Sequence, residues 1–318
     1  MVPSVNASAD LVIRPLRESD LDQADRVFRV AFGTQFGLAD PTRFRGDAEL
    51  IRPRWRTDPR PCFAAEIDGR VVGSAIAMDW GSALVVGPLS VEPAHANRGI
   101  GRRLMAALMA FAEEQRFPLT VLYTLPNSAK HIRLYESHGF RARRLTPVMA
   151  KVPSAGAAAA PRLWSSLAPD ARRSALAACR AVSDAIFPGL DLTREIVAAA
   201  AQNLGETVLL ERDGAIGGFA VCHLGKGSEA GSGALYVKFA CVRPGAADDF
   251  AALVAACEAL AARRGAQRIV AGTNMAREAA YRTMLERGYR AEIVGVAMLR
   301  SDQPGWNRPE VFALDDWR

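Results

Sequence analysis

The stretch Ala83–Leu104, ALVVGPLSVEPAHANRGIGRRL, is the one around which the chain is organised. Its first part, Ala83–Val91, is a run of apolar and small residues whose length and composition predict a largely buried strand. Pro93 ends this strand, because proline lacks the N–H that a neighbouring strand would pair with. Arg98-Gly99-Ile100-Gly101 then leads into a helix, and a glycine-rich turn of this kind leaves unpaired backbone N–H groups at the helix start. The stretch therefore predicts an anion site at the mouth of the helix.

Two familiar phosphate-binding turns do not fit this pattern. The P-loop needs a Lys-Ser/Thr pair after its second glycine, whereas Arg102-Arg103 follows Gly101. The dinucleotide-binding fingerprint needs a third glycine where Leu104 stands, and the region before the turn predicts consecutive hairpins rather than a β-α-β unit. A different fold must use this turn.

A second stretch, Leu119–Phe140, has the sequence LTVLYTLPNSAKHIRLYESHGF and predicts a strand, a short loop and a helix. Together the two stretches contain an apolar strand ending in V-E-P, the turn R-G-I-G-R-R-L, a helix, another strand and N-S-A-K-H-I-R-L-Y-E-S-H-G-F. In this order and spacing the chain resembles the GCN5-related N-acetyltransferase (GNAT) superfamily. The resemblance covers about Leu11–Lys151 and is densest from Leu89 to Phe140.

The resemblance implies an α/β (α+β) fold with a mixed, mostly antiparallel twisted sheet, flanked by helices and containing a splayed strand pair. It implies an N-acetyltransferase that depends on acetyl-CoA. The pantetheine arm of acetyl-CoA would then hydrogen-bond to the exposed edge of the splayed strand. Tyr135 matches the family's tyrosine that protonates the departing CoA thiolate. The residues carried over as cofactor-binding are Leu89, Val91, Ala96, Asn97, Arg98, Gly99, Ile100, Gly101, Arg102, Asn127 and Ser128.

The chain departs from the family pattern at two positions. Ala96 stands where the family has Gln or Arg, and Arg98 is a candidate to supply the missing charge. The family asparagine lies seven residues before the tyrosine, but Asn127 lies eight before Tyr135, so Ser128 holds the aligned position. Either side chain could contact the cofactor.

Amide formation needs an oxyanion donor and a base as well as the tyrosine. The backbone N–H of Val91 is the expected donor to the thioester carbonyl. Glu92 and Asp79 are the carboxylates nearest the expected site, and His138 is a poorer candidate because it lies beyond Tyr135. Glu92 is the candidate catalytic base, although a strand-end glutamate can also be an ordinary solvated charge.

Other elements are expected around this unit. Leu11–Leu16 predicts a strand, Ser19 is expected to cap a helix over 20–32, and Asp68-Gly69 predicts the turn of a hairpin. Phe140–Lys151 is expected to supply the last two strands of the unit. In the resembling family the segment 33–60 shapes the acceptor pocket, so four aromatic residues are candidates to line it or to pack in the core: Phe32, Phe36, Phe44 and Trp55.

Composition sets the wider class. The chain has 318 residues, which favours two domains, and its 50% hydrophobic content is that of a soluble globular protein. It has no apolar run long enough for a membrane span and no signal peptide, and its five cysteines are dispersed in apolar surroundings, so we expect a cytoplasmic protein with reduced thiols. Four histidines without ligand spacing predict no metal site.

The positive charge of the chain lies mostly in its first part. Residues 1–152 carry 21 Lys and Arg against 16 Asp and Glu, which suits the phosphates of CoA. No nucleic-acid-binding motif accompanies this charge.

The second part of the chain echoes the first. Asp68-Gly69 recurs as Asp213-Gly214, V-E-P as Val242-Arg-Pro244, and Gly139-Phe140 as Gly288-Tyr289. Matches in order and at nearly constant offset predict a duplicated domain. We expect a catalytic domain over 1–152, a linker over 153–169, and a GNAT-like domain over 170–318 whose tail packs as a strand or strap.

The second copy lacks the chemistry of the first. Asp248 and Asp249 stand where the phosphate would bind, and Met284 occupies the position of Tyr135. This copy is expected to be structural or to wall the acceptor site.

Three functions stay open on the sequence. The first is an acetyl-CoA-dependent N-acetyltransferase acting on the amine of a small molecule or peptide. The others are a CoA-binding sensor without turnover, and a two-domain acyltransferase whose acceptor bridges the domains.

Overall fold

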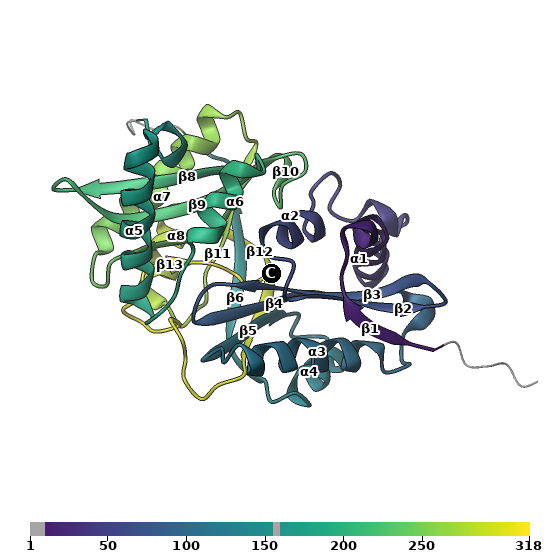
Figure 1. Ribbon diagram of the computed structural model, residues 1–318. Coiled ribbons are helices and arrows are strands. Elements are labelled where there is room, and N and C mark those ends of the chain that lie inside the picture. The colour runs from purple at the N-terminus through teal and green to yellow at the C-terminus, as the bar shows by residue number, and fades with distance from the viewer. Residues whose placement is uncertain (1–9, 155–159) are drawn as a thin grey trace, which may run out of the picture.

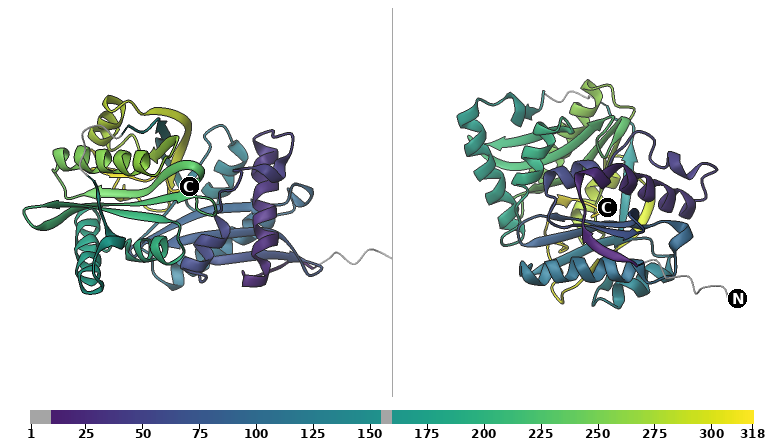
Figure 2. Two further views of the ribbon diagram at one scale, coloured as in Figure 1. Left: turned by 90° about the horizontal axis from the view of Figure 1, so that it is seen from above. Right: turned by 45° about the vertical axis from the view of Figure 1, so that its right-hand side comes forward.

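The structure is a computed structural model that describes residues 10–154 and 160–318. Figure 1 shows two halves joined through one continuous sheet, and the views in Figure 2 show helices on both faces of each half. The expectations for residues 1–9, and for the centre of the predicted linker at 155–159, lie outside the described residues.

The first half follows the predicted order closely. Its elements are β1 (Val12–Pro15), α1 (Leu21–Gln35), α2 (Ile51–Thr57), β2 (Cys62–Ile67), β3 (Arg70–Asp79), β4 (Ala83–Val91), α3 (Ile100–Glu114), β5 (Leu119–Thr124), α4 (Ala129–Glu136) and β6 (Arg141–Lys151). Asp68 and Gly69 both have positive φ, 50° and 74°, as the two-residue hairpin turn between β2 and β3 requires.

The second half repeats this order. Its elements are β7 (Arg162–Leu163), α5 (Pro169–Ile186), α6 (Thr193–Ala201), β8 (Gly205–Arg212), β9 (Ala215–Gly225), β10 (Gly231–Val242), α7 (Ala247–Arg263), β11 (Arg268–Gly272), α8 (Glu278–Glu286), β12 (Arg290–Leu299) and β13 (Ala313–Leu314). β7 lies within 153–169, the range expected to be the linker, and pairs with β8. The tail forms β13 against β10, which confirms the predicted final strand.

Alternation along the strands separates apolar cores on the two faces of the sheet, and the core under α5 extends into the first half through Trp80 and Val85. In the first half, α1 and α2 pack on Cys62, Ala64 and Ile76, while α3 packs on the opposite face of the same sheet. In the second half, α5 and α6 cover one face of β8–β10, and α7 and α8 cover the other. Side chains of successive strand residues point to opposite faces of the sheet, so one strand contributes side chains to the cores on both faces.

The two halves exchange their last strands. The strand order is β1-β2-β3-β4-β5-β12-β6-β11-β10-β9-β8-β7, with β13 added on β10. β12 of the second half therefore pairs with β5 of the first, and β6 of the first half pairs with β11 of the second. The expectation that Phe140–Lys151 supplies two strands is wrong: it forms the single strand β6, because β12 takes the place beside β5.

The predicted helix cap at Ser19 is also wrong. A 3-10 turn over Glu18–Asp20 precedes α1, which begins at Leu21 without a side-chain cap. The Asp20 carboxylate accepts hydrogen bonds from the Arg17 N–H at 2.8 Å and from Arg14 Nη1 at 2.6 Å. This carboxylate therefore fixes the turn from strand to helix.

Because of the strand exchange, the first half is not expected to fold alone. A fragment of residues 1–152 lacks β12, which contributes Val296 and Met298 to the core beneath α3 and covers the edge of β5. An uncovered edge and core favour aggregation. We expect the fragment to aggregate or lack a cooperative transition by size-exclusion chromatography and circular dichroism, and co-expression with residues 153–318 to restore a stable complex. A monomeric fragment that unfolds cooperatively would show that β12 is dispensable.

A buried ionic cluster fastens α2 to the second half. Arg54 donates to both carboxylate oxygens of Glu229, at 2.9 and 2.5 Å. Lys238 Nζ lies 2.8 Å from Glu229 and 2.9 Å from Glu195, which also accepts from Trp80 Nε1 at 3.0 Å. Arg54 and Lys238 hold the pKa of the Glu229 carboxyl well below its ordinary value against the opposing effect of burial.

Replacing Glu229 by glutamine is therefore expected to lower the free energy of unfolding by about 3–5 kcal/mol near neutral pH, because it leaves Arg54 and Lys238 buried with less counter-charge. Because folding lowers the pKa of Glu229, its ionised carboxylate stabilises the folded state at pH values above 4.5, the ordinary pKa of the group. This stabilisation is lost progressively as the pH falls below 4.5. The gap between variant and wild type should thus narrow below pH 4.5, measured by urea unfolding. The exposed Glu114→Gln is the matched control.

Three further predictions can be compared with the fold. All five cysteines are buried and free, in agreement with the predicted core thiols. In the described parts of the chain, no helix is both long and apolar enough to cross a membrane. Across the same residues, no group of three or more His, Cys, Asp or Glu side chains is arranged to hold a metal ion.

Candidate active site

The first half contains a splayed strand pair. β4 and β5 run parallel and pair from Ala83↔Leu119 to Val86↔Leu122, and the pairing stops there. β4 continues alongside β3 as far as Val91↔Gly73. The residues of β4 beyond Val86 therefore have one main-chain edge that β5 does not pair, as the resemblance implied.

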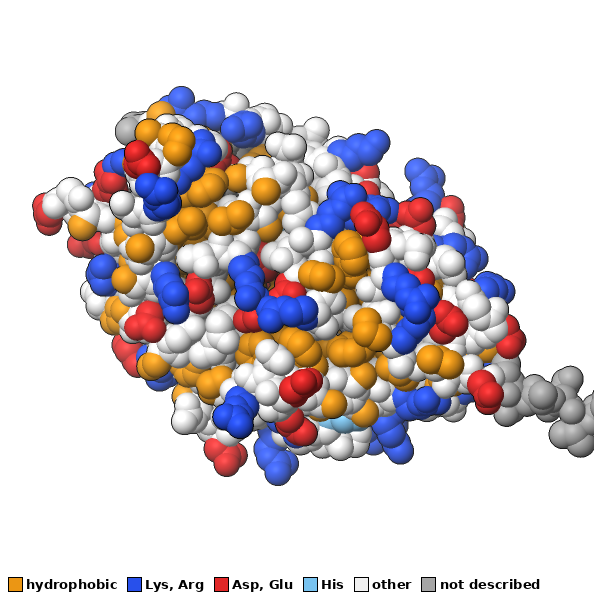
Figure 3. All heavy atoms as spheres, in the orientation of Figure 1, with side chains coloured by type: hydrophobic (Ala, Val, Ile, Leu, Met, Phe, Trp, Pro, Cys, Tyr) orange, Lys and Arg blue, Asp and Glu red, His pale blue; other side chains and the backbone are white. Residues whose placement is uncertain are grey.

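A cavity of about 960 Å³ lies over this splay. It is lined by Val86–Val91 of β4, the turn before α3, the end of β5, α4, α1 and the loop after α1. A cavity of this size can hold an extended ligand together with a second small molecule. Figure 3 shows Lys and Arg side chains beside hydrophobic ones over the middle of the molecule, between the two halves.

The glycine turn forms one end of the cavity. Gly99 has φ 77°, and apart from its chain neighbours no described residue comes within 4 Å of a Cβ built on it. The first helical bond of α3 runs from the Arg103 N–H to the Gly99 carbonyl at 3.1 Å, so the N–H groups of the three residues before Arg103 have no partner within the helix. Three basic residues of this region line the cavity: Arg102, Lys130 and Arg133. Amides, the helix dipole and cations together favour an anion here.

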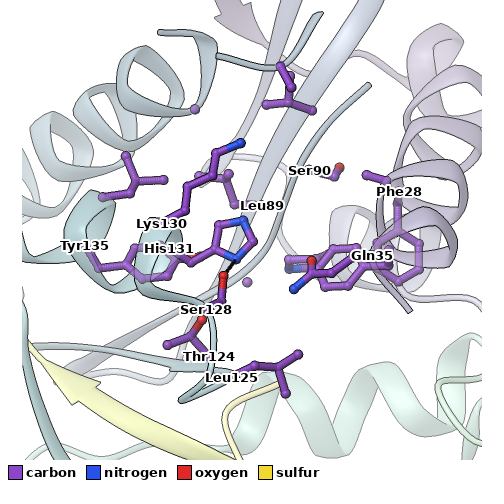
Figure 4. Close-up of a pocket in the computed structure, with 18 of the residues that line it drawn as sticks. Phe28, Gln35, Leu89, Ser90, Thr124, Leu125, Ser128, Lys130, His131 and Tyr135 are labelled. Atoms are coloured by element: carbon purple, nitrogen blue, oxygen red, sulfur yellow. Dashed lines mark hydrogen bonds between the residues drawn. The ribbon is translucent and has the colours of Figure 1, made fainter. Parts of the chain in front are cut away.

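Most of the predicted cofactor residues meet in the cavity, and the others lie outside its lining. Those that line it are Leu89, Val91, Ala96, Asn97, Gly99, Ile100, Gly101, Arg102 and Ser128. Arg98 and Asn127 are exposed and not among its lining residues. Ser128 Oγ lies 2.7 Å from His131 Nδ1, drawn in Figure 4 as the dashed contact, so this serine begins α4 without a side-chain cap.

Tyr135 lies in the cavity wall on α4, as Figure 4 shows. It is buried and packs edge-on against Phe140, with ring centroids 6.3 Å apart. Burial raises the pKa of the Tyr135 phenol to about 12. The hydroxyl therefore stays protonated at neutral pH and is suited to donate a proton.

The carboxylates named as base candidates lie outside the lining of the cavity. The Glu92 carboxylate lies 3.3 Å from Arg26 Nη1 and 3.8 Å from His95 Nε2. His95 lines the cavity, whereas Glu92 and Arg26 do not. Asp79 pairs with Arg60 and Arg194. His138, just past the end of α4, has its Nδ1 3.0 Å from the Leu134 carbonyl oxygen and does not line the cavity.

Several cavity residues were not predicted from the sequence. His95 and His131 line it, and burial together with Lys130 lowers the pKa of His131. Tyr123, Arg45, Gln35 and three residues of the second half, Ile293, Trp317 and Arg318, also line it. The tail residues carry no motif that places them near β4, so only the folded chain shows their position. Of the aromatic candidates, Phe32, Phe36 and Phe44 line the cavity, while Trp55 instead donates to the Leu16 carbonyl at 2.9 Å.

The second half has different residues at the corresponding positions. Met284 on α8 is fully buried in the core under α7. Asp248 and Asp249 lie in the first turn of α7, and Asp249 pairs with Arg212 at 2.7 Å. Carboxylates at this helix start would repel a phosphate.

Similarity to known proteins identifies the family of this chain. Residues 27–140 match the acetyltransferase (GNAT) family. An uncharacterized N-acetyltransferase of Methanocaldococcus jannaschii is 32% identical over 143 residues, which make up 43% of this chain and 82% of that protein. The chain belongs to the GNAT acetyltransferase family. It is thus an N-acetyltransferase, and the family uses acyl-CoA donors.

Solved structures extend the likeness to the whole of this GNAT protein. A candidate acetyltransferase from Pyrococcus horikoshii matches with a TM-score of 0.69 and 13% identity, over 100% of this chain and 98% of that one. A GCN5-related N-acetyltransferase from Sphaerobacter thermophilus matches with a TM-score of 0.59 and 18% identity, over 93% and 96%. At these identities the likeness concerns the fold, and it confirms that the GNAT-type fold continues through both halves.

Proposed function

We propose that this chain transfers an acetyl group from acetyl-CoA directly to the primary amine of a small-molecule or peptide acceptor. One observation carries the proposal: the glycine turn, the unpaired edge of β4 and Tyr135 line the same cavity. In this proposal residues 1–152 form the catalytic domain, 153–169 connect the domains, and 170–318 form a non-catalytic GNAT-like domain.

The residues present fit acetyl-CoA. The free amides and cations around Gly99 and Gly101 suit a diphosphate, and the edge of β4 at Leu89 and Val91 suits the amides of a pantetheine arm. Gly101 lines the cavity, and a Cβ built on it would lie 3.6 Å from Leu134 and 3.7 Å from Leu89, two other residues of the lining. Asn97 and Ser128 also line this end. When bound, acetyl-CoA supplies the acetyl group as a thioester.

The chain's own residues would then position and move protons. The Val91 N–H is proposed to donate to the carbonyl oxygen on which charge develops. The Tyr135 hydroxyl, which keeps its proton at neutral pH, is proposed to donate to the leaving sulfur. Glu92 is proposed as the acceptor of the amine proton. Glu92 does not line the cavity, so the proton would pass to it through His95. His95 lines the cavity, and its Nε2 lies 3.8 Å from the Glu92 carboxylate.

A bridging acceptor is favoured by a specific observation. Ile293, Trp317 and Arg318 of the second half line the same cavity as Tyr135. The second half is therefore proposed to wall the acceptor end while the first half supplies the chemistry.

Titration calorimetry and a thiol assay test this function. We expect one CoA bound per chain, and release of free thiol from acetyl-CoA that depends on an added amine. No heat with CoA would refute the proposed cofactor site, and two CoA per chain would refute a non-catalytic second half.

A further inference from the structure

The acceptor end of the cavity is rich in aromatic side chains. We call Phe28, Phe32, Phe36 and Phe44 the phenylalanine cluster, and all four line the cavity. Phe44 stacks on Phe32 with centroids 5.7 Å apart and on Phe36 with centroids 5.5 Å apart. Figure 4 places Phe28 and Gln35 across the cavity from Tyr135 and His131. This wall would be well matched to a flat apolar group.

A cation without a carboxylate partner lies beside this cluster. Arg45 directly follows Phe44 and lines the cavity, and its Nη2 donates to the Glu229 carbonyl at 2.7 Å. Among residues 10–154 and 160–318 no Asp or Glu lies within ion-pair distance of Arg45, whereas the nearby Arg318 pairs with Asp316 at 2.9 Å. Burial, together with the charge of Arg318, lowers the pKa of Arg45 to about 10. A partly buried guanidinium without a carboxylate partner is stabilised by an anion.

Another polar side chain of the cavity has no hydrogen-bond partner among the described residues. The hydroxyl of Tyr123 on β5 is buried and has no hydrogen-bond partner in the described parts of the chain, and Tyr123 lines the cavity. Its ring lies over Gly295 of β12, where a Cβ would come within 2.1 Å of the ring. A buried hydroxyl left unpaired is unfavourable, so a ligand group that bonds to it would be stabilised.

We propose that the acceptor is an amine that also carries an anionic group and an aromatic ring, with the anion at Arg45 and the ring on the phenylalanine cluster. This inference rests on the proposed function, since it names the acceptor class of the same site. A carboxylate and a phosphonate share the required chemistry, because both match the donor fork of a guanidinium. Neutral amines and amines without a ring lose one of the two contacts.

A matched panel of amines tests this class with the full chain and acetyl-CoA. The anionic aromatic members are L-phenylalanine, L-tryptophan, 3-amino-3-phenylpropanoate, 4-(aminomethyl)benzoate and 1-amino-2-phenylethylphosphonate. 2-Phenylethylamine lacks the anion and L-alanine lacks the ring. We expect at least one anionic aromatic amine to exceed both comparison amines in kcat/KM by about tenfold or more. A carboxylate preferred over the phosphonate, or the reverse, identifies the anion.

Arg45→Gln tests the residue, and the exposed Arg43→Gln on the same segment is its matched control. Arg45→Gln is expected to reduce the preference for the anionic amine over 2-phenylethylamine by about tenfold, mainly through KM, and Arg45→Lys to restore part of it. The unfolding midpoint of each variant separates loss of recognition from loss of fold. A folded Arg45→Gln variant with unchanged preference would overturn the inference.

Failure of the inference differs from failure of the proposed function. If CoA binds but none of the anionic aromatic amines is acetylated, the acceptor class is wrong and the cofactor site stands. The same holds if 2-phenylethylamine or L-alanine reacts with a kcat/KM equal to that of the best anionic aromatic amine. If CoA does not bind, the proposed function itself fails.

Discussion

Replacing Tyr135 by phenylalanine is expected to lower kcat by about 100-fold to 10,000-fold, the range for loss of a positioned general acid. The variant keeps the ring that packs on Phe140 and loses only the hydroxyl. Because the lost interaction acts on the leaving sulfur, the Kd for CoA is expected to stay within about twofold of the wild type. Steady-state release of thiol and calorimetry with CoA measure the two quantities.

The second half offers a matched control for this variant. Tyr281 lies on α8, the helix that corresponds to α4, and is partly buried one turn before Met284. Tyr281→Phe should leave kcat unchanged. Wild-type kcat in Tyr135→Phe would mean that the leaving thiolate needs no protonation from this phenol.

Replacing Gly101 by glutamate is expected to weaken CoA binding by about 100-fold or more, equivalent to about 2.8 kcal/mol of binding free energy. The carboxylate would lie in the first turn of α3, where the free amides and Arg102 are proposed to hold a diphosphate. Negative charge near a helix start stabilises the helix itself. The unfolding midpoint is therefore expected to hold or rise while the Kd for CoA increases.

Two companion variants separate charge from bulk and from position. Gly101→Ala places a Cβ at ordinary contact distances, 3.6 Å from Leu134 and 3.7 Å from Leu89, so most of the affinity should remain. Ala247→Glu puts the same carboxylate at the exposed start of α7, where no effect on CoA is expected. Undiminished affinity in Gly101→Glu would place the diphosphate elsewhere.

Local sequence predicted the elements of the first half because their signals lie within a few residues of each other. The apolar run of β4, the positive-φ pair Asp68-Gly69 and the glycines of the turn before α3 each fix a local conformation. The same holds for Tyr135, whose spacing to Gly139-Phe140 is set by a single helix and its end. These short-range constraints act in any chain that contains them.

Partners that lie far apart in the sequence could not be read in this way. β12 fits beside β5, and β6 beside β11, because two similar halves offer each other equivalent edges, and no local pattern tells these edges apart. The ion pair of Arg54 with Glu229 and the cavity position of Arg318 likewise depend on how the halves meet. The base candidate Glu92 shows the same limit, since it lies 3.3 Å from Arg26 of α1, a partner 66 residues away in the sequence.

By itself, the sequence determined the class of this protein, a tandem GNAT-type fold with the glycine turn before α3 and Tyr135 on α4 in its first half. These features are encoded in contiguous segments whose backbone geometry is local. The tertiary structure alone decided that the halves share one sheet by strand exchange, and that Arg45 and the tail face the cavity over β4. Burial and charge pairing at a junction of distant segments are properties of the packed chain, because they depend on which surfaces exclude water together.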